Sequence, residues 1–437
     1  MRPPERRPLT LRLLGGLVVW IATLYCGPAK RTGRGRGSEG SGLYPELAVF
    51  GIREGSSPAL ASQVGRLSAL LPSYELARGE LAQRGVPLDI KVVHRLARHL
   101  GAEMLTTRTR DLHHYRAGEL PRGQELAGKR VGVAIDGGRT RLRTVLRKQK
   151  GRGQGKKQRR RYRAEWREPK VLIIFEMDER GRMVAGSRAW IDGTFAGPDE
   201  VMELLAMHLH RLGAAAAAVV TFLADGAPWI WERLAWVEKR VGLSPRRTVQ
   251  VLDWCHALHH VSLALEALGL EAKERRRVYG QCRKWLRAGQ VGKVLAELAV
   301  RGGDRADDAA LETELRYLEK HQSAGHLDYN RYRRRGLALG SGAIESAIRR
   351  VVNLRLKGPG LMWREENAEA HLVLRAAVLT ERWQETLEHV RTTMASDRRL
   401  DWHWKSPDMP AELKAGVPIA PPLPQVAAEQ QAQSAAA

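Results

Sequence analysis

Five short apolar segments in the middle of the chain restrict its fold more than any other feature of the sequence. Most of them are rich in Val, Ile, Leu or Phe, and all are short enough to be strands. Helical patterns lie between the later segments, so the order of elements predicts an α/β layer. The expected strands span residues 130–136, 170–177, 183–191, 216–224 and 248–252, and an amphipathic helix is expected over residues 198–212.

Acidic residues follow three of these expected strands. Asp136, Asp225 and Asp253 stand at their carboxyl ends, which is where open α/β sheets place their functional sites. A plain turn role explains each residue equally well when it is taken alone. Asp136 precedes Gly137, Asp225 precedes Gly226, and aspartates in such positions bind the backbone of a turn.

A second acidic candidate, Glu345, lies in the segment 337–357, where a Gly-Ser-Gly turn leads into an apolar period typical of one helix face. Glu345 is the only carboxylate in this segment and is surrounded by basic residues, as a metal ligand close to a bound polyanion would be. The alternative is a surface acid in the first turn of a helix, where it complements the helix dipole and pairs with Arg349.

The charge of the chain points to a polyanionic partner. It contains 73 Lys and Arg against 48 Asp and Glu, a formal net charge of +25. Such an excess favours nucleic acid or an anionic membrane. Between the first two expected strands, residues 139–167 form a basic arm too densely charged to pack, and we expect it to contact DNA rather than to be only a solvated loop.

Twelve individual residues, eleven of them basic, are candidates for DNA contacts. In the basic arm they are Arg147, Lys148, Lys150, Arg152, Lys156, Lys157, Arg159, Arg160 and Arg161. Arg349 and Arg350 lie close to Glu345 and either guide DNA or pair with that acid. Trp363 is a candidate for stacking on an unpaired base.

The N-terminal segment differs from the regions that follow it. Residues 1–40 are expected to form a β-hairpin and a linker. The alternative is a signal peptide, although the apolar run of residues 13–26 is shorter than the roughly 20 residues of a spanning helix.

The other regions that flank the expected sheet are mainly helical. Residues 41–125 are expected to contain helices over 59–71, 75–84 and 90–100, which form either a DNA-binding region or a plain bundle. Residues 257–335 form a helical insertion, a last helix spans 363–382, and residues 391–437 are a partly disordered tail.

The candidate acids suit a divalent metal ion. Asp136, Asp225 and Glu345 are hard oxygen ligands of the kind that Mg²⁺ or Mn²⁺ prefers, and two such ions promote phosphoryl transfer. Asp253 and His256 are three residues apart at an expected strand-to-helix junction, so we expect them to contact each other close to the candidate metal ligands. Zinc bound through Cys255 is a weaker alternative, because no second ligand pair has a standard spacing.

Several motifs together resemble a bacterial insertion-sequence transposase of the DDE class, of the branch related to Mutator-like transposases. They are Val-Ala-Ile-Asp136-Gly-Gly, Phe-Leu-Ala-Asp225-Gly-Ala-Pro-Trp-Ile-Trp231, Leu-Asp253-Trp-Cys-His256, Gly340-Ser-Gly-Ala-Ile-Glu345-Ser and the stretch from Asn353 to Ala376. The resemblance covers residues 40 to 385. Relatives often carry several cysteines near the N-terminus, whereas this chain has only Cys26 there.

The resemblance implies an RNase H-like catalytic core, in parts 126–256 and 336–390, that is split by the helical insertion. It implies that Asp136, Asp225 and Glu345 are the catalytic triad and metal ligands, with Asp253 and His256 as an accessory pair. The expected cofactor is Mg²⁺ or Mn²⁺. The expected partner is double-stranded DNA, both the terminal inverted repeats and the target.

We therefore expect a DNA transposase that cleaves phosphodiesters and transfers strands at the ends of its element. It is expected to be a homo-oligomer, without membrane association, in the cytoplasm close to the nucleoid; the three cysteines of the chain fit a reducing compartment. Two alternatives stay open. One is a decayed transposase that binds DNA without catalysis, and the other is an RNase H-like nuclease.

Overall fold

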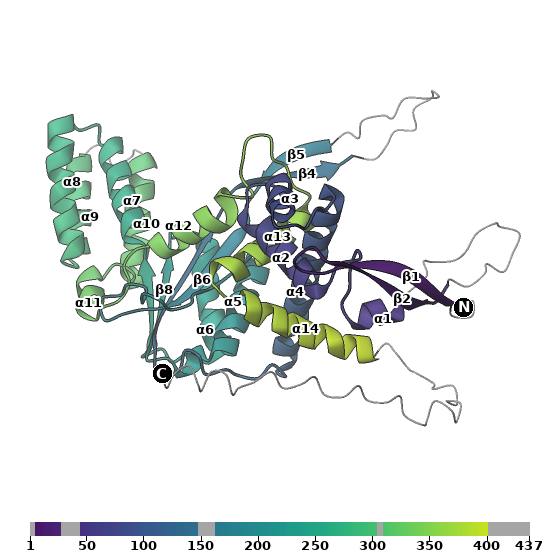
Figure 1. Ribbon diagram of the computed structural model, residues 1–437. Coiled ribbons are helices and arrows are strands. Elements are labelled where there is room, and N and C mark those ends of the chain that lie inside the picture. Colours follow the sequence, from purple (N-terminus) through teal and green to yellow (C-terminus); the bar gives the residue numbers. More distant parts are fainter. Residues whose placement is uncertain (1–4, 28–43, 147–161, 304–308, 401–437) are drawn as a thin grey trace, which may run out of the picture. The chain divides into compact units, whose positions relative to one another are not determined.

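The computed structural model describes residues 5–27, 44–146, 162–303 and 309–400. Residues up to Met394 belong to one compact unit, and a second unit begins at Ala395. The first unit is a mixed α/β structure, as the strand and helix patterns predict, with its helices labelled α and its strands labelled β along the chain (Figure 1).

A mixed five-stranded sheet is the centre of this unit. Its strands lie in the order β7-β6-β3-β8-β9. The neighbours β3, β8 and β9 are parallel, whereas β6 is antiparallel to both β3 and β7. The strands are β3 (Arg130–Gly137), β6 (Lys170–Glu176), β7 (Trp190–Thr194), β8 (Val219–Ala224) and β9 (Thr248–Leu252).

Both faces of the sheet are covered by helices, which explains why its strands are continuous apolar runs. Val131, Val133 and Ile135 of β3 point to one face, where α5 (Pro198–Leu212) and α6 (Pro228–Val241) pack. Ala134 points to the other face, which is covered by α7 (Trp254–Ala267) and α12 (Gly342–Ile348). Alternate residues of a strand point to opposite faces, so Asp136 shares the α7 and α12 face with Ala134.

Two strand predictions were wrong at their starts. The third strand was expected over residues 183–191, but β7 begins only at Trp190, because a turn in which Ser187 binds the Val184 carbonyl interrupts the segment. The fourth strand was expected from residue 216, but β8 begins at Val219. A 3₁₀ turn at Ala214–Ala216, which follows Gly213 at φ +79°, occupies the start.

A β-hairpin is present near the N-terminus, as the sequence predicts. β1 (Glu5–Arg12) and β2 (Val18–Tyr25) pair in antiparallel register across a turn in which Gly15 and Gly16 have φ of +91° and +89°. Those angles are easy only for glycine, so the Gly-Gly pair sets the position of the turn.

A second hairpin forms the two ends of the basic arm, although the charge density of this segment predicts that it does not pack. β4 (Thr140–Val145) pairs with β5 (Tyr162–Arg167) in antiparallel register. Thr140 and Leu142 are buried, and this alternation with exposed residues is what makes a strand possible within a basic sequence. The nine arm residues predicted to contact DNA, from Arg147 to Arg161, lie outside the described residues.

The N-terminal helical region contains one helix much longer than expected. α4 (Ile90–Ala117) was predicted to end at residue 100, before Gly101. Instead Gly101 lies inside the helix, where a Cβ would come within 2.7 Å of the Cβ of Ala370 in α13 (Glu365–Leu379). The glycine thus permits close packing of two helices rather than ending one. The other helices of this region are α1 (Pro45–Val49), α2 (Pro58–Leu70) and α3 (Tyr74–Gln83).

The remaining helices form the insertion and the C-terminal part. The insertion contains α7 and then α8 (Ala272–Arg287), α9 (Val291–Gly302), α10 (Ala309–Ser323) and α11 (Tyr329–Arg334). After α12 follow a π-helical segment (Arg349–Asn353), α13 (Glu365–Leu379) and α14 (Trp383–Leu400). The predicted last helix over 363–382 is therefore too long at its end. α13 ends at Leu379, and Glu381 has a left-handed backbone conformation with φ +58°. The next helix, α14, extends into the predicted tail.

Two buried arginines join the N-terminal helices to the C-terminal part. Arg375 of α13 donates to the carbonyls of Ala69, Arg350 and Val351, and Arg355 donates to the carbonyl of Ser68. Ser68 and Ala69 belong to the last turn of α2, whose carbonyls have no partner within the helix. Burial lowers the pKa of Arg375 to about 10, and the positive charge of Arg355 contributes to this shift.

We predict that Arg375→Ala destabilises the protein by about 2–4 kcal/mol, because it leaves buried carbonyls without a donor and creates a cavity. Chemical denaturation followed by circular dichroism measures this change. Arg316, whose side chain is 70% exposed, provides the control, and its replacement by Ala is expected to change stability by less than about 0.5 kcal/mol. Equal stability of the two variants would contradict the structural role of Arg375.

In the part of the chain that the structure describes, no helix combines the length and apolar character needed to cross a membrane.

Candidate functional site

Three aspartates lie in a row across the parallel strands. Ala134 of β3 is paired with Leu223 of β8, and Leu223 is paired with Val251 of β9. Continuing this register by two residues places Asp136 beside Asp225 and Asp225 beside Asp253. The backbone N–H of Asp253 donates to the carbonyl of Ala224 at 2.8 Å, so the alignment of β8 and β9 persists to this point. Neighbouring strands are about 4.8 Å apart.

Asp136 is half-buried at the end of β3 and accepts a hydrogen bond from the N–H of Gly137 at 2.6 Å. Burial raises the pKa of Asp136 to about 6, and the negative charges of Asp225 and Glu168 contribute. The positive charge of His256 acts in the opposite direction. Asp136, Asp225 and His256 are therefore close enough to interact electrostatically.

The helical insertion holds the turn that carries Asp225. Oδ1 of Asp225 accepts from the N–H of Ala227 at 3.0 Å, and its carbonyl accepts from the Tyr317 hydroxyl of α10 at 2.9 Å. Gly226 follows at φ +90°, and a Cβ there would overlap the Tyr317 oxygen. The turn thus requires glycine, and α10 fixes the backbone on which the carboxylate stands.

Asp253 is completely buried and begins α7 as its N-cap. Its Oδ1 accepts from the N–H of His256 at 2.8 Å and lies 2.9 Å from His256 Nδ1. Burial alone would raise the pKa of Asp253, but the hydrogen bonds from His256 and Ser341 lower it. The predicted contact between Asp253 and His256 is thus present.

His256 is the member of this pair that reaches the site. The bond to Asp253 raises the pKa of His256, and the charges of Asp225 and Asp136 raise it further. Its side chain is 38% exposed, whereas that of Asp253 is inaccessible. Asp253 therefore positions His256 and Ser341, and His256 can interact with a ligand.

Glu345 is connected to the same network through Ser341, the N-cap of α12. The N–H of Ser341 donates to Asp253 Oδ2 at 2.5 Å, and its hydroxyl donates to Glu345 Oε1 at 2.8 Å. α12 packs against β3 and β6, so the Glu345 helix covers the sheet face to which Asp136 belongs. Arg349, the expected ion-pair partner, is the C-cap of this helix, and the bond of Glu345 goes to Ser341 instead.

The structure brings these residues into one region but not into a preformed metal centre. Among the described residues, no three His, Cys, Asp or Glu side chains are close enough together to hold a metal ion. The oxygen chemistry of Asp136 and Asp225 nevertheless fits Mg²⁺ or Mn²⁺, because two adjacent carboxylates repel each other unless a cation neutralises them. Burial raises the pKa of Asp136 most, and the charge of Asp225 contributes to the same shift.

Two features of the region were not found from the sequence. Glu168 lies so close to the end of β3 that a Cβ on Gly137 would overlap its carboxylate. Ser341 connects Asp253 with Glu345, although serines in a Gly-Ser-Gly turn usually serve only the turn. In the sequence, Glu168 differs from other acids only by its place just before an expected strand, and many acids that have no role in a site share such a place.

The residues predicted to contact DNA that lie within the described part of the chain differ in their exposure. Arg349 is exposed and Arg350 is half-buried, so both can reach a ligand at the surface. Trp363 is 8% exposed; its Nε1–H donates to the Leu356 carbonyl and its ring lies beneath the Arg355 guanidinium. A buried ring with these partners does not fit the predicted stacking on a base.

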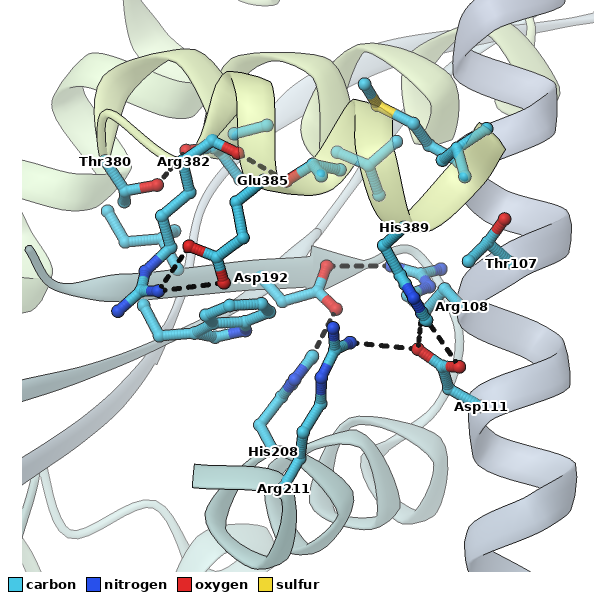
Figure 2. Close-up of a pocket in the computed structure, with 18 of the residues that line it drawn as sticks. Thr107, Arg108, Asp111, Asp192, His208, Arg211, Thr380, Arg382, Glu385 and His389 are labelled. Atoms are coloured by element: carbon cyan, nitrogen blue, oxygen red, sulfur yellow. Dashed lines mark hydrogen bonds and ion pairs between the residues drawn. The ribbon is translucent and has the colours of Figure 1, made fainter. Parts of the chain in front are cut away.

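A separate cluster of buried charges joins α4 to the edge of the sheet (Figure 2). Arg108 donates to Asp192 of β7 at 2.9 Å and to Glu369 of α13 at 2.6 Å, and His208 Nε2 lies 2.8 Å from Asp192. Burial alone would raise the pKa of Asp192, but the Arg108 charge and the bond to His208 lower it to about 2. No sequence pattern links these isolated positions.

A cavity of about 80 Å³ lies beside this cluster, and Asp111 lines it together with Asp192. Asp111 accepts from Arg211 at 2.9 Å and lies 2.8 Å from His389 Nε2 of α14. Both aspartates are thus neutralised by basic partners, as Figure 2 shows. This cluster contains none of the predicted site residues, and its balanced ion pairs indicate a structural role.

A scan against models of known protein families and a search of curated proteins find no match to this chain.

We predict that Asp136→Asn stabilises the metal-free protein at neutral pH. A carboxyl whose pKa is raised from 3.8 to about 6 contributes stability below pH 4 that is lost as the pH rises through 6. The asparagine keeps the acceptor for Gly137 but carries no charge. After allowance for solvent screening, we expect a gain of about 1–2 kcal/mol at pH 7.5.

Denaturation curves at pH 4 and pH 7.5 in the presence of a chelator measure this effect. Asp178 is the control, because the N–H of Arg182 lowers the pKa of its carboxyl and Asp178→Asn is expected to lose stability at neutral pH. An Asp136→Asn variant that is less stable than the wild type at pH 7.5 would contradict the description of the site.

Proposed function

We propose that the protein is a metal-dependent DNA transposase that cleaves and joins phosphodiesters, with an RNase H-like core. The observation that carries this proposal is the alignment of Asp136 and Asp225 on neighbouring parallel strands, in electrostatic contact with each other and with His256. The Glu345 helix covers the same face of the sheet. Carboxylates arranged at the carboxyl ends of strands are suited to phosphoryl transfer in an α/β core.

The architecture supports the RNase H-like assignment. Numbered along the chain within the sheet, the five strands lie in the order 3-2-1-4-5, and the second is antiparallel to its neighbours. The first and fourth strands carry the two proposed catalytic aspartates. The helical insertion lies between the fifth strand and the Glu345 helix, where the resemblance implies it.

The residues of the site have distinct proposed roles. Asp136 and Asp225, with Glu345, would hold Mg²⁺ or Mn²⁺, which supplies activation of the attacking oxygen and stabilisation of the leaving one. His256 donates through Nδ1 to Asp253, which leaves Nε2 available to a phosphate oxygen, and its raised pKa favours the cationic form. Asp253 and Ser341 position His256 and Glu345.

The charge of the chain supports DNA as the substrate. Its net charge of +25 favours a phosphate backbone through counterion release. Arg349 and the half-buried Arg350 come four and five residues after Glu345, about one helical turn away, so positive charge lies close to this proposed catalytic acid. Because a transposase bridges two DNA ends, we also propose that the active form is a homo-oligomer.

We predict that Asp136→Asn, Asp225→Asn and Glu345→Gln each abolish cleavage without weakening DNA binding. The substrate is a supercoiled plasmid carrying the gene of this chain with its flanking DNA, incubated with Mg²⁺ or Mn²⁺, and nicks are mapped by primer extension. Each variant is expected to lose at least a thousandfold in rate, since carboxylates that neutralise metal charge act as a unit. Glu366→Gln, an exposed acid in the first turn of α13, is the control with wild-type activity.

The outcomes separate the proposal from its alternatives. Nicks at the two ends of the element, followed by strand transfer, are the expected result. Retained strand transfer in Glu345→Gln would refute the role of that residue. DNA binding without any metal-dependent nicking would replace the enzyme with a DNA-binding protein, and cleavage confined to RNA–DNA hybrids would replace it with an RNase H-like nuclease.

A further inference from the structure

A groove lies between the β4–β5 hairpin and the loop that precedes α13. It has a volume of about 530 Å³, and Trp166 and Arg141 form one wall, while the loop from Lys357 to Leu361 forms the other. Trp166 and Arg141 are direct partners across the hairpin. Trp166 is 50% exposed, whereas Trp363 is buried.

One face of the hairpin carries two aromatic residues on β5 and two arginines on β4. Because alternate residues share a face, Tyr162, Ala164 and Trp166 of β5 lie opposite Val145, Arg143 and Arg141 of β4. Leu142 points the other way and is buried. The guanidinium carbons of Arg141 and Arg139 lie 5.3 Å and 5.6 Å from the centroid of the Trp166 ring, so two positive charges lie beside one exposed indole.

Both walls of the groove are held in place by hydrogen bonds to the core. The buried Thr140 hydroxyl donates to the Leu356 carbonyl at 2.7 Å, and the Trp363 Nε1–H donates to the same oxygen at 3.1 Å. The backbones of Arg143 and Trp363 are bonded at 2.7 Å. Trp166 is therefore exposed on a hairpin that is fixed to the core.

The chain connects the groove with the proposed catalytic region over a few residues. Gly138, two residues after Asp136, lies against the π-helical segment, and a Cβ there would be 3.2 Å from Cγ1 of Val352. The next residue, Asn353, lines the groove. Arg139 and Arg141 follow Asp136 at the start of the hairpin. The groove wall formed by Arg141 thus begins five residues after Asp136 in the chain.

We infer that this groove binds an unpaired nucleotide of DNA, with its base stacked on Trp166 and its neighbouring phosphates beside Arg141 and Lys357. An exposed indole provides a stacking surface that every base can use. The adjacent cations complement phosphate charge but not a second basic surface, and the chain as a whole is strongly basic. The inference rests on the DNA-binding part of the proposed function and does not require catalysis.

The test uses the full chain and two DNA probes of equal length. One is fully paired, and the other ends in a short single-stranded overhang with 2-aminopurine, whose fluorescence falls when it stacks on an aromatic ring. We expect the wild type to quench this fluorescence and to bind the overhang probe about tenfold more tightly than the duplex. Trp166→Ala is expected to abolish the quenching and the preference while leaving duplex affinity unchanged.

Matched variants make the result specific. Trp166→Phe retains an aromatic ring and is expected to keep most of the preference. Trp236 of α6, which is 46% exposed, is the control, and Trp236→Ala is expected to behave as the wild type. Thermal denaturation checks that each variant is folded. Because Trp166 is half exposed, its replacement is expected to leave the fold intact.

Four results would overturn the inference. In the first, Trp166→Ala retains the quenching. In the second, poly-glutamate displaces the overhang probe as well as an oligonucleotide of equal charge does, which means that the groove recognises charge alone. In the third, both probes bind equally, so the inference fails while DNA binding stands. In the fourth, neither probe binds, and the proposed function fails as well.

Discussion

The alignment of β3, β8 and β9 is the constraint on which the rest of the site depends. Parallel strands in this register place Asp136, Asp225 and Asp253 side by side on one face of the sheet. Such a row of carboxylates is unfavourable unless its charges are paired. The protein resolves this at Asp253 through His256 and Ser341, whereas Asp136 retains a raised pKa. The difference separates the structural Asp253 from Asp136, which remains available to a ligand.

Elements far apart in the sequence support this row. Tyr317 of the helical insertion fixes the turn of Asp225, and Ser341 connects Asp253 with Glu345 of α12. On the other side, the bonds of Arg375 to α2 join the N-terminal helices to the π-helical segment that follows α12. The insertion and the N-terminal region are therefore parts of the structure that positions the site, beside any role they have in contacting DNA.

Much of the fold could be predicted from local patterns. The apolar runs that became β3 and β6 are buried on both faces, and such runs are recognisable without knowledge of their partners. The limits of β7 and α4 were wrong because they depend on a turn near Gly186 and on packing at Gly101. In the candidate site, the sequence indicated Asp136, Asp225, Asp253 and Glu345 but not the contacts through Ser341 and Glu168, since these join residues distant in the chain. The burial of Trp363 and the exposure of Trp166 likewise depend on tertiary packing alone.

The proposed function requires that Asp136 and Asp225 share a divalent metal ion. Anomalous diffraction from crystals of the full chain soaked in Mn²⁺ tests it most directly, because the scattering locates the ion without reference to activity. The account predicts an anomalous peak about 2.0–2.3 Å from carboxylate oxygens of both aspartates, with the Glu345 side chain turned from Ser341 towards it. No peak between the two carboxylates at saturating Mn²⁺, or a peak held only by other residues, would contradict it.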